Sequence, residues 1–212
     1  MKLRLHLTLA LLTSFCALSL ENPVFGSESS GLSTINAQRK ALFVKTLSDN
    51  YSKIAPSDLK PHFKTREDII KWLEAYYEEE LSYYNTATHP INFFNIYMGG
   101  RLIGFAISEK WQGEEATLHI RQMDILPEKQ HQGYGTALLQ SVIRRQDFPV
   151  ENVVLDTRTL NTKARNFYKV NGFEVCLACH DPELDPKAYL GLKLDVTGKT
   201  SLLNNSGAAI GA

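Results

Sequence analysis

The chain has 212 residues, of which 43% are hydrophobic and 22% charged, a composition typical of a globular protein that buries a core. Lysine plus arginine and aspartate plus glutamate each number 23, so the formal net charge at neutral pH is zero. This balance gives no positive field that would attract nucleic acid or an anionic membrane, and we expect neither as a partner.

The first 26 residues have the layout of a secretory signal peptide. Basic residues within positions 1–6 precede a mostly apolar, uncharged run over positions 7–20, and small residues offer cleavage after Ser19 or Gly26. The apolar run is short for a stable membrane span. We therefore expect residues 1–26 to direct export to the periplasm or the medium, with a cytoplasmic location as the alternative. A Ser- and Gly-rich linker is expected over residues 27–36.

Helical spacing of apolar residues predicts two helices next. The first covers residues 37–54, and the second is opened by Thr65, a good N-cap residue, and carries an apolar stripe over residues 69–77. The acidic run at 78–80 is interpreted as a solvated helix face, and a binding site for an amine substrate is the alternative. Two apolar-rich runs around Gly99-Gly100 then predict a β-hairpin.

The middle of the chain holds a strand, a glycine-bearing turn and a helix in succession. An aliphatic run over residues 118–126 predicts the strand, and apolar spacing between residues 138 and 143 predicts a helix that begins near Gly133. The first amides of such a helix have no internal partner and lie at the positive end of its dipole, which is the geometry of an anion site. A turn that needs glycine only for its own conformation is the alternative.

Two motifs here resemble those of the GNAT N-acetyltransferases. Residues 130–135, Gln-His-Gln-Gly-Tyr-Gly, are similar to the family's acetyl-CoA signature. Residues 161–173, Asn-Thr-Lys-Ala-Arg-Asn-Phe-Tyr-Lys-Val-Asn-Gly-Phe, are similar to its second core motif, and the resemblance covers roughly residues 91–196. It implies an α/β fold of GNAT type, a single domain over residues 37–196 whose mixed, mostly antiparallel central sheet is flanked by helices and splays at its fourth strand. The small, polar tail over residues 197–212 is expected to be disordered.

The resemblance also implies an activity, the transfer of acetyl from acetyl-CoA to a primary amine of a small molecule, peptide or protein by direct attack and without a metal. It places the donor's pyrophosphate on backbone amides of the glycine turn and its pantetheine arm along the preceding strand, with an asparagine of the second motif contacting the cofactor. The implied cofactor-binding residues are Met123, Asp124, Ile125, Gln130, His131, Gln132, Gly133, Tyr134, Gly135, Thr136 and Asn161.

Three residues are candidates for the chemistry. Tyr168 matches the family's motif tyrosine, whose neutral phenol donates a proton to the leaving CoA thiolate. His119 lies six residues before Ile125, on the same face of an ideal strand as Arg121 and Met123, and is the first candidate for the base that deprotonates the amine. Asp156, at the end of the next predicted strand, is the rival base. Helix capping by the motif asparagine and plain packing of the tyrosine are the structural alternatives.

Two other functions stay open on the sequence. A protein of the same fold could bind CoA without turnover, as a sensor or interaction module, and the family often forms homodimers through edge strands. Cys176-Leu-Ala-Cys-His180 matches the c-type haem attachment pattern, so an exported haem or redox protein is the remote alternative. Residues 173–179 and 188–196 are predicted to form the last two strands. Because residues three apart on a regular strand face opposite ways, a disulfide between Cys176 and Cys179 is not expected, and the pattern is attributed to chance.

Overall fold

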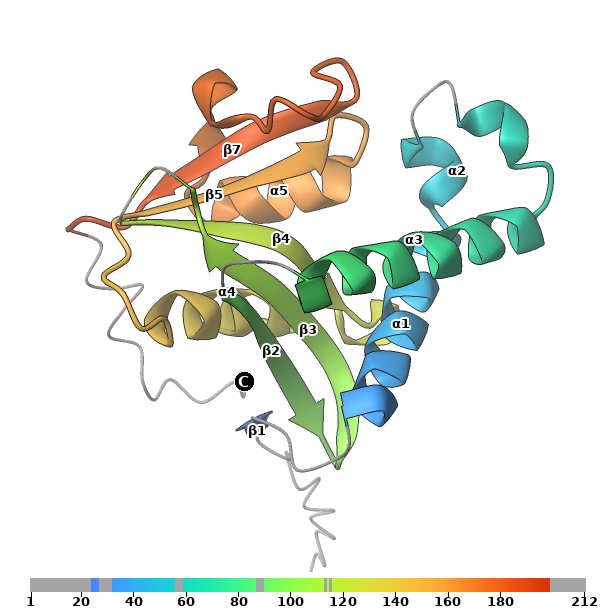
Figure 1. Ribbon diagram of the computed structural model, residues 1–212, viewed down its shortest axis with the longest axis horizontal. Coiled ribbons are helices and arrows are strands. Elements are labelled where there is room, and N and C mark those ends of the chain that lie inside the picture. Colours follow the sequence, from blue (N-terminus) through green and yellow to red (C-terminus); the bar gives the residue numbers. More distant parts are fainter. Residues whose placement is uncertain are drawn as a thin grey trace, which may run out of the picture.

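A single sheet forms the centre of the fold. The computed structural model describes residues 24–26, 32–55, 59–86, 90–112, 114 and 116–198. Seven strands lie in the order β1-β2-β3-β4-β5-β7-β6 (Figure 1). They are β1 (Val24–Gly26), β2 (Ile91–Met98), β3 (Arg101–Lys110), β4 (Thr117–Ile125), β5 (Asn152–Arg158), β6 (Glu174–Val175) and β7 (Tyr189–Asp195). The pair β4–β5 is parallel and the other neighbouring pairs are antiparallel, so the predicted mixed, mostly antiparallel sheet is confirmed.

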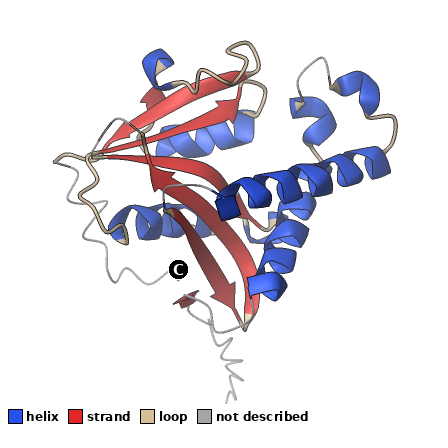
Figure 2. Ribbon diagram, in the orientation of Figure 1, coloured by secondary structure: helices blue, strands red, loops and turns tan. Residues whose placement is uncertain are grey.

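Helices flank this sheet on both sides. They are α1 (Leu32–Ser48), α2 (Tyr51–Ile54), α3 (Arg66–Thr86), α4 (Tyr134–Arg144) and α5 (Thr162–Val170), with 3-10 turns η1 (Lys60–His62), η2 (Pro127–Lys129) and η3 (Leu177–Cys179). In the view of Figures 1 and 2, α3 crosses in front of the strands and α4 and α5 lie behind them. Strand β3 is buried at every position between its two terminal residues, as expected for a strand covered on both faces. The core therefore lies in two layers, one on each side of β3.

The parallel pair β4–β5 is hydrogen-bonded only at its beginning. Residues Thr117–His119 of β4 pair with Asn152–Val154 of β5. Beyond this point β4 pairs only with β3 and β5 only with β7, and Figure 1 shows the two strands diverging. The expected splay at the fourth strand is thus confirmed, and it leaves the facing edges of both strands without a strand partner.

Local signals placed several elements correctly. Strands β2 and β3 form the predicted hairpin around Gly99 and Gly100, both of which have positive φ angles, 56° and 71°. Thr65 and Asp68 form a reciprocal capping box at the start of α3: the Asp68 N–H donates to Thr65 Oγ1 at 3.2 Å, and the Thr65 N–H donates to Asp68 Oδ2 at 2.7 Å. These hydrogen bonds lower the pKa of Asp68, which suits a carboxylate at a helix N-terminus.

The single helix predicted over residues 37–54 is wrong in two respects. Helix α1 begins at Leu32, so residues 32–36 of the predicted linker are helical, and Ile35 among them is buried. The helix ends at Ser48, and a turn in which the Asn50 N–H donates to the Leu47 carbonyl separates it from α2. Asp49-Asn50 lies at this break, and such side chains compete with the helical backbone for hydrogen bonds.

The strand predicted over residues 173–179 is also wrong for most of its length. Strand β6 ends at Val175, and the 3-10 turn η3 brings Cys176 and Cys179 within 5.3 Å between Cα atoms, where they form a disulfide. The expectation of opposite faces therefore fails because this segment is not extended. Its backbone lies close to Gly191, where a Cβ atom would approach the Cys176 carbonyl oxygen to 2.6 Å, so the turn needs glycine opposite it.

The two ends of the chain are described only in part. Of the predicted signal peptide, residues 1–23 lie outside the described residues, while Val24–Gly26 forms β1 and pairs with β2. Of the predicted tail, residues 199–212 also lie outside them. Within the part of the chain that is described, no helix is both long and apolar enough to cross a membrane.

Candidate active site

A cavity of about 240 Å³ lies where β4 and β5 part. Aromatic and aliphatic side chains of α1, α2 and α3 form one wall, and polar side chains of β4 and β5 form the other. Six residues predicted from the sequence line it, namely His119, Met123, Asp124, Asp156, Asn161 and Tyr168. The three candidates for proton transfer, His119, Asp156 and Tyr168, lie on β4, β5 and α5. The fold brings them into one cavity although they are far apart in the sequence.

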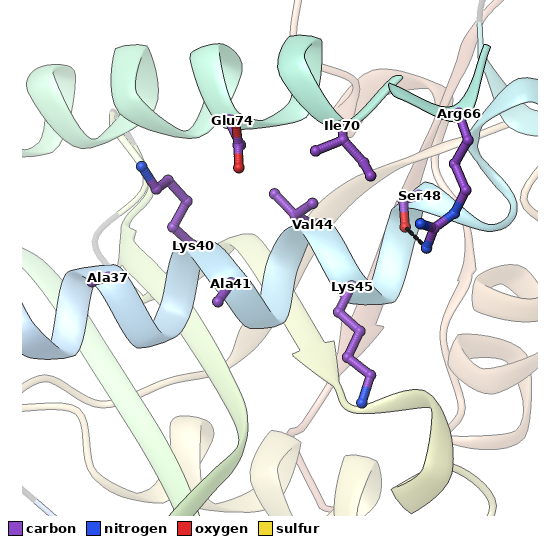
Figure 3. Close-up of a pocket in the computed structure, with 9 residues that line it drawn as sticks. All are labelled: Ala37, Lys40, Ala41, Val44, Lys45, Ser48, Arg66, Ile70 and Glu74. Carbon is purple, nitrogen blue, oxygen red and sulfur yellow. Dashed lines mark hydrogen bonds between the residues drawn. The ribbon is translucent and has the colours of Figure 1, made fainter. Parts of the chain in front are cut away.

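A larger hollow of about 350 Å³ lies between α1 and α3 (Figure 3). It is lined by Ala37, Lys40, Ala41, Val44, Lys45, Ser48, Arg66, Ile70 and Glu74, none of which is a predicted site residue. Its lysines already have carboxylate partners, since Lys40 pairs with Glu78 at 2.7 Å and Lys45 with Glu128 at 2.7 Å. The smaller cavity at the parted strands is therefore the candidate site.

The glycine turn follows the end of β4 and does not line the cavity. Gly133 has a φ of 83°, the left-handed conformation that favours glycine, and caps α4. The Ala137 N–H donates to the Gly133 carbonyl at 3.0 Å, so the amides of residues 134–136 have no carbonyl four residues earlier within the helix. Gln130 Nε2 donates to the Ile125 carbonyl at 3.0 Å and ties the turn to the strand end. The turn presents backbone N–H groups at a positive helix end, as predicted.

Gly135 has a packing role that the sequence analysis did not include. A Cβ atom at this position would lie 2.9 Å from Cε2 of Phe167, so α4 and α5 approach each other here only because residue 135 has no side chain. This packing requirement is separate from the expected contact of the glycine turn with a pyrophosphate, which stays a prediction.

Asp124 is the most deeply buried acid of the cavity. Its side chain is 5% exposed and accepts a hydrogen bond from Gln122 Nε2. Burial raises the pKa of this carboxyl to about 7, although the Gln122 hydrogen bond opposes the shift. The sequence had assigned Asp124 only a backbone role along the donor, and its side chain was missed.

Tyr168 combines the two roles considered for it. Its ring packs edge-on against Phe167 and Phe173, at centroid distances of 5.1 and 5.2 Å, and 8% of the residue remains exposed on the cavity. Burial, together with the charge of Asp124, raises the pKa of the phenol above its ordinary value. The hydroxyl is therefore neutral at physiological pH and able to donate a proton. Asn161 likewise lines the cavity while its Oδ1 accepts from the Ala164 N–H at 3.3 Å as the N-cap of α5.

His119 is held by a carboxylate. Its Nδ1 lies 3.0 Å from Glu109 Oε1, and the same oxygen accepts from Arg121 Nη1 at 3.0 Å. The ring stands edge-on to Trp111, with centroids 4.5 Å apart, and the residue is 6% exposed. A neutral imidazole that donates from Nδ1 to a carboxylate keeps its lone pair on Nε2, the form that a base requires. Glu109 was missed by the sequence analysis, although the pairing of β3 with β4 places it directly opposite His119.

A bulge in β4 modifies the predicted alternation of its side chains. Ile107 pairs with Gln122 and Ser108 with Ile120, so Arg121 has no partner in β3. Before the bulge, His119 and Arg121 share a face of the strand as predicted, because both side chains contact Glu109. After it, Gln122 and Asp124 share a face and bond to each other.

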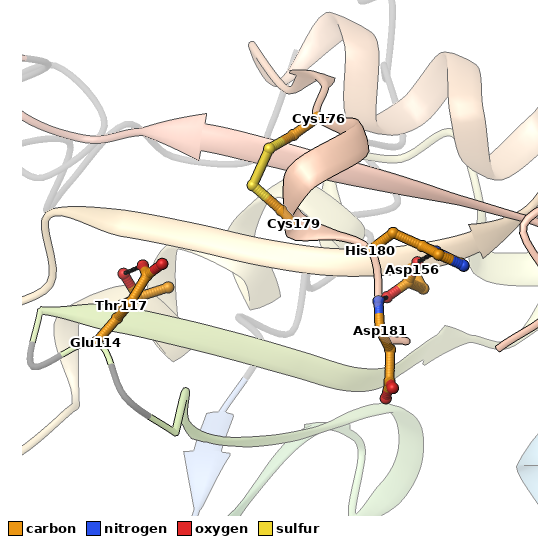
Figure 4. Close-up of a disulfide and its surroundings, with 7 residues drawn as sticks. All are labelled: Glu114, Thr117, Asp156, Cys176, Cys179, His180 and Asp181. Atoms are coloured by element: carbon orange, nitrogen blue, oxygen red, sulfur yellow. Dashed lines mark hydrogen bonds and ion pairs between the residues drawn. A yellow bond between two sulfur atoms is a disulfide. The ribbon is translucent and has the colours of Figure 1, made fainter. Parts of the chain in front are cut away.

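Asp156 is engaged by the segment that follows the disulfide (Figure 4). Its Oδ1 lies 2.5 Å from His180 Nδ1, and its Oδ2 accepts from the Asp181 N–H at 3.1 Å. His180 Nε2 lies 3.0 Å from the Leu184 carbonyl oxygen, which can only accept, so this nitrogen carries a proton. Burial lowers the pKa of His180, but its hydrogen bonds to Asp156 and Leu184 and the Asp156 charge raise it above its ordinary value. Both ring nitrogens of His180 thus face acceptors, an arrangement that favours the imidazolium form of this histidine.

This arrangement does not fit covalent haem attachment. The two cysteines are joined to each other, and both ring nitrogens of His180 have partners within the chain. In the described part of the chain, no three His, Cys, Asp or Glu side chains gather in a way that could hold a metal ion. The Cys176-x-x-Cys179-His180 pattern therefore forms a disulfide-closed turn that places His180 beside Asp156.

The comparisons with known proteins agree with this geometry. The model of the acetyltransferase (GNAT) family matches residues 58–173, which is more than half of the chain. The chain belongs to the GNAT family. The comparison with curated proteins found no match.

Solved structures show the GNAT fold. The structure is similar to PaiA N-acetyltransferase from Thermoplasma acidophilum in complex with coenzyme A, with 16% identity over 82% of this chain and 99% of that chain and a TM-score of 0.59. It is also similar to an acetyltransferase from Thermus thermophilus, with 14% identity over 82% and 96% and a TM-score of 0.55. A third is the ribosomal-protein-S18-alanine N-acetyltransferase from Escherichia coli, with 16% identity over 82% and 94% and a TM-score of 0.52.

The GNAT family uses acetyl-CoA, and the residues present fit this co-substrate. The helix amides after Gly133 suit a pyrophosphate, and the unpaired edge of β4 around Met123 and Asp124 suits an extended, amide-bearing pantetheine arm. The Ile125 carbonyl is occupied by Gln130, so the donor would use the strand edge before it. The remaining wall of the cavity is formed by α1–α3 and the ends of β5 and β7, whose aromatic residues were expected mainly to pack.

Proposed function

We propose that this GNAT acetyltransferase transfers acetyl from acetyl-CoA to a primary amine by direct attack. One observation carries the proposal: a neutral tyrosine, a carboxylate-held histidine and an asparagine line the same cavity at the point where β4 and β5 part. The glycine turn follows the end of β4, and β4 also lines the cavity, so this strand connects the expected donor site with the proton-transfer groups.

The donor is held by backbone groups. The amides at the start of α4 hydrogen-bond to the pyrophosphate, and the free edge of β4 pairs with the pantetheine amides. A backbone N–H near Met123 polarises the thioester carbonyl, which stabilises the oxyanion that forms there during attack. Asn161 contacts the donor from the opposite strand end.

The reaction needs two proton transfers. The amine nitrogen attacks the thioester carbon, so that a C–N bond forms and the C–S bond breaks. His119 takes the proton that the amine loses, through Nε2, because Nδ1 is fixed on Glu109. Tyr168 donates its phenolic proton to the departing thiolate of CoA. Asp156 is the second candidate for the base, although an imidazolium and an amide N–H already occupy its oxygens.

Turnover of Tyr168→Phe tests the proposal. We expect kcat for an accepted amine to fall by about 10²- to 10⁴-fold while the Kd for acetyl-CoA stays within about twofold. Amines are screened by the thiol released from acetyl-CoA, and acetyl-CoA binding is measured by calorimetry. Acetyl-CoA binding without turnover of any amine would contradict the proposal and favour a CoA-binding module.

The two candidate bases are separated by the rates of their variants. If His119 is the base, His119→Gln should lower kcat by about 10²- to 10⁴-fold at an unchanged Kd for acetyl-CoA, because the amine then has no proton acceptor. Asp156→Asn should keep most of the rate in that case. The reverse result would assign the role to Asp156.

We further propose that the chain is exported and that the signal peptide is cleaved after Ser19. Cleavage after Gly26 would remove β1, which pairs with β2, whereas cleavage after Ser19 retains it. The mass of the mature N-terminus, determined on protein from the periplasmic and cytosolic fractions, tests this. Protein with an intact N-terminus found only in the cytosol would contradict export.

A further inference from the structure

Arg158 is an unusual member of the cavity wall. It is the last residue of β5 and lies two residues after Asp156, so both side chains project from the same face of the strand. Its guanidinium lies over the ring of Tyr51 at 4.8 Å and over that of Tyr189 at 5.0 Å. Nη2 donates to the Tyr51 hydroxyl, whereas the buried Nη1 has no hydrogen-bond partner among the described residues. The hydrogen-bonding capacity of the guanidinium is therefore only partly used.

The charge of Arg158 is also without a counterion. In the part of the chain that is described, no carboxylate lies within ion-pairing distance of this guanidinium, although Asp156 and Asp181 line the same cavity. Arg121 provides the contrast, because it lies 3.0 Å from Glu109 and 3.7 Å from Glu80. A half-buried cation that lacks both an anion and a full set of acceptors is unfavourable unless a ligand supplies them.

The wall beside Arg158 is aromatic. Trp72 stacks on Tyr76 at 5.3 Å and lies 5.0 Å from Tyr51, so the three rings form a continuous apolar surface that ends at the guanidinium. The whole cavity holds about 240 Å³, which is small for a ligand pocket. A small acceptor with an apolar body and an anionic end matches this surface, since its body covers the rings and its anion reaches Arg158.

We propose that the amine acceptor is a small amino carboxylate whose carboxylate binds Arg158. This rests on the proposed acetyl transfer and names its acceptor class. The planar guanidinium matches a carboxylate through paired N–H donors, and a phosphate would offer related chemistry. Asp181 also lines the cavity and supplies a carboxylate that suits the ammonium group of such a zwitterion.

The test compares L-phenylalanine, its amide and 2-phenylethylamine, which share one skeleton and differ only in the carboxylate. O-phosphoethanolamine, which has no ring, is added as a phosphate-bearing amine. Each is offered with acetyl-CoA to the full chain, to Arg158→Gln and to Arg144→Gln. Arg144 is an exposed arginine of α4 and serves as the matched control. Wild type should prefer phenylalanine to the amide and to phenylethylamine. Arg158→Gln should lower kcat/KM for phenylalanine by about 10- to 100-fold, through KM, without affecting phenylethylamine.

Two results would overturn the proposal: equal loss of rate on charged and uncharged acceptors, or a wild-type preference for phenylethylamine. A wild-type preference for O-phosphoethanolamine over phenylalanine and phenylethylamine would mean that Arg158 binds a phosphate and not a carboxylate. Binding of 3-phenylpropionate, which has no amine, is measured by calorimetry in the presence of CoA and is independent of turnover. If no amine is acetylated, the proposed function fails, and loss of this binding in Arg158→Gln but not in Arg144→Gln still supports an anion subsite. No binding to wild type would refute it.

Discussion

Replacement of Asp124 by asparagine should change how stability depends on pH. Asp124 is 5% exposed, and burial raises the pKa of its carboxyl to about 7, compared with about 3.9 in an unfolded chain. Between these two values the folded protein keeps a proton that the unfolded chain releases. The free energy of unfolding therefore falls as pH rises from about 4 to about 7 and is level above that. A pKa difference of about three units corresponds to a loss of about 4 kcal/mol in the free energy of unfolding between pH 4 and pH 7.

Asp124→Asn removes this titration and keeps the shape of the side chain, including an oxygen that can accept from Gln122. The variant should gain stability relative to the wild type across this window, and the difference should be largest above pH 7. Urea unfolding at pH 4.5, 6 and 8 gives the free energies, with the exposed Glu174→Gln as the control for loss of a carboxylate. A difference between Asp124→Asn and wild type that does not change with pH would refute the reasoning.

Two further substitutions probe the surroundings of the site. Gly135→Ala places a Cβ atom 2.9 Å from Phe167 Cε2, so it should lower the free energy of unfolding by about 1–3 kcal/mol, and the added change Phe167→Leu should restore part of the loss in thermal unfolding. No loss of unfolding free energy in Gly135→Ala would contradict the close approach of α4 and α5. The second substitution, His180→Gln, removes a histidine whose pKa is raised by Asp156 and the Leu184 carbonyl. The stabilisation that protonated His180 gives the wild type should be complete below pH about 6.5 and disappear as pH rises through the raised pKa. Denaturant unfolding at pH 6 and pH 9 measures this, and an equal effect at both would show that the ion pair does not form.

Features encoded by neighbouring residues were predictable from the sequence. The hairpin follows from Gly99-Gly100, and the strand, turn and helix around Gly133 follow from an apolar run and its spacing. Tyr168 and Asn161 were placed by a motif whose residues lie on one helix and its N-cap. In each case the residues that decide the conformation lie within a few positions of one another.

Contacts between distant segments were not predictable in the same way. The His180–Asp156 pair depends on β6 ending at Val175 and on the close approach of this turn to Gly191, neither of which is a local property of the cysteine motif. The contact between Arg158 and Tyr51 joins residues 107 positions apart, so only the folded chain reveals it. The bulge at Arg121 likewise depends on the register with β3.

Binding of acetyl-CoA to the glycine turn is the most direct test of the acetyltransferase assignment. Calorimetric titration of acetyl-CoA into the full chain is compared with Gly133→Asp, which places a side chain and a negative charge at the helix N-terminus. Gly100→Asp is the matched control, because Gly100 also has a positive φ, 71°, and a Cβ atom added there in the hairpin turn would meet no other atom within 4 Å. We predict that wild type and Gly100→Asp bind alike and that Gly133→Asp loses at least about tenfold in affinity. Unchanged affinity in Gly133→Asp, or no binding by folded wild type, would contradict the assignment of the donor site.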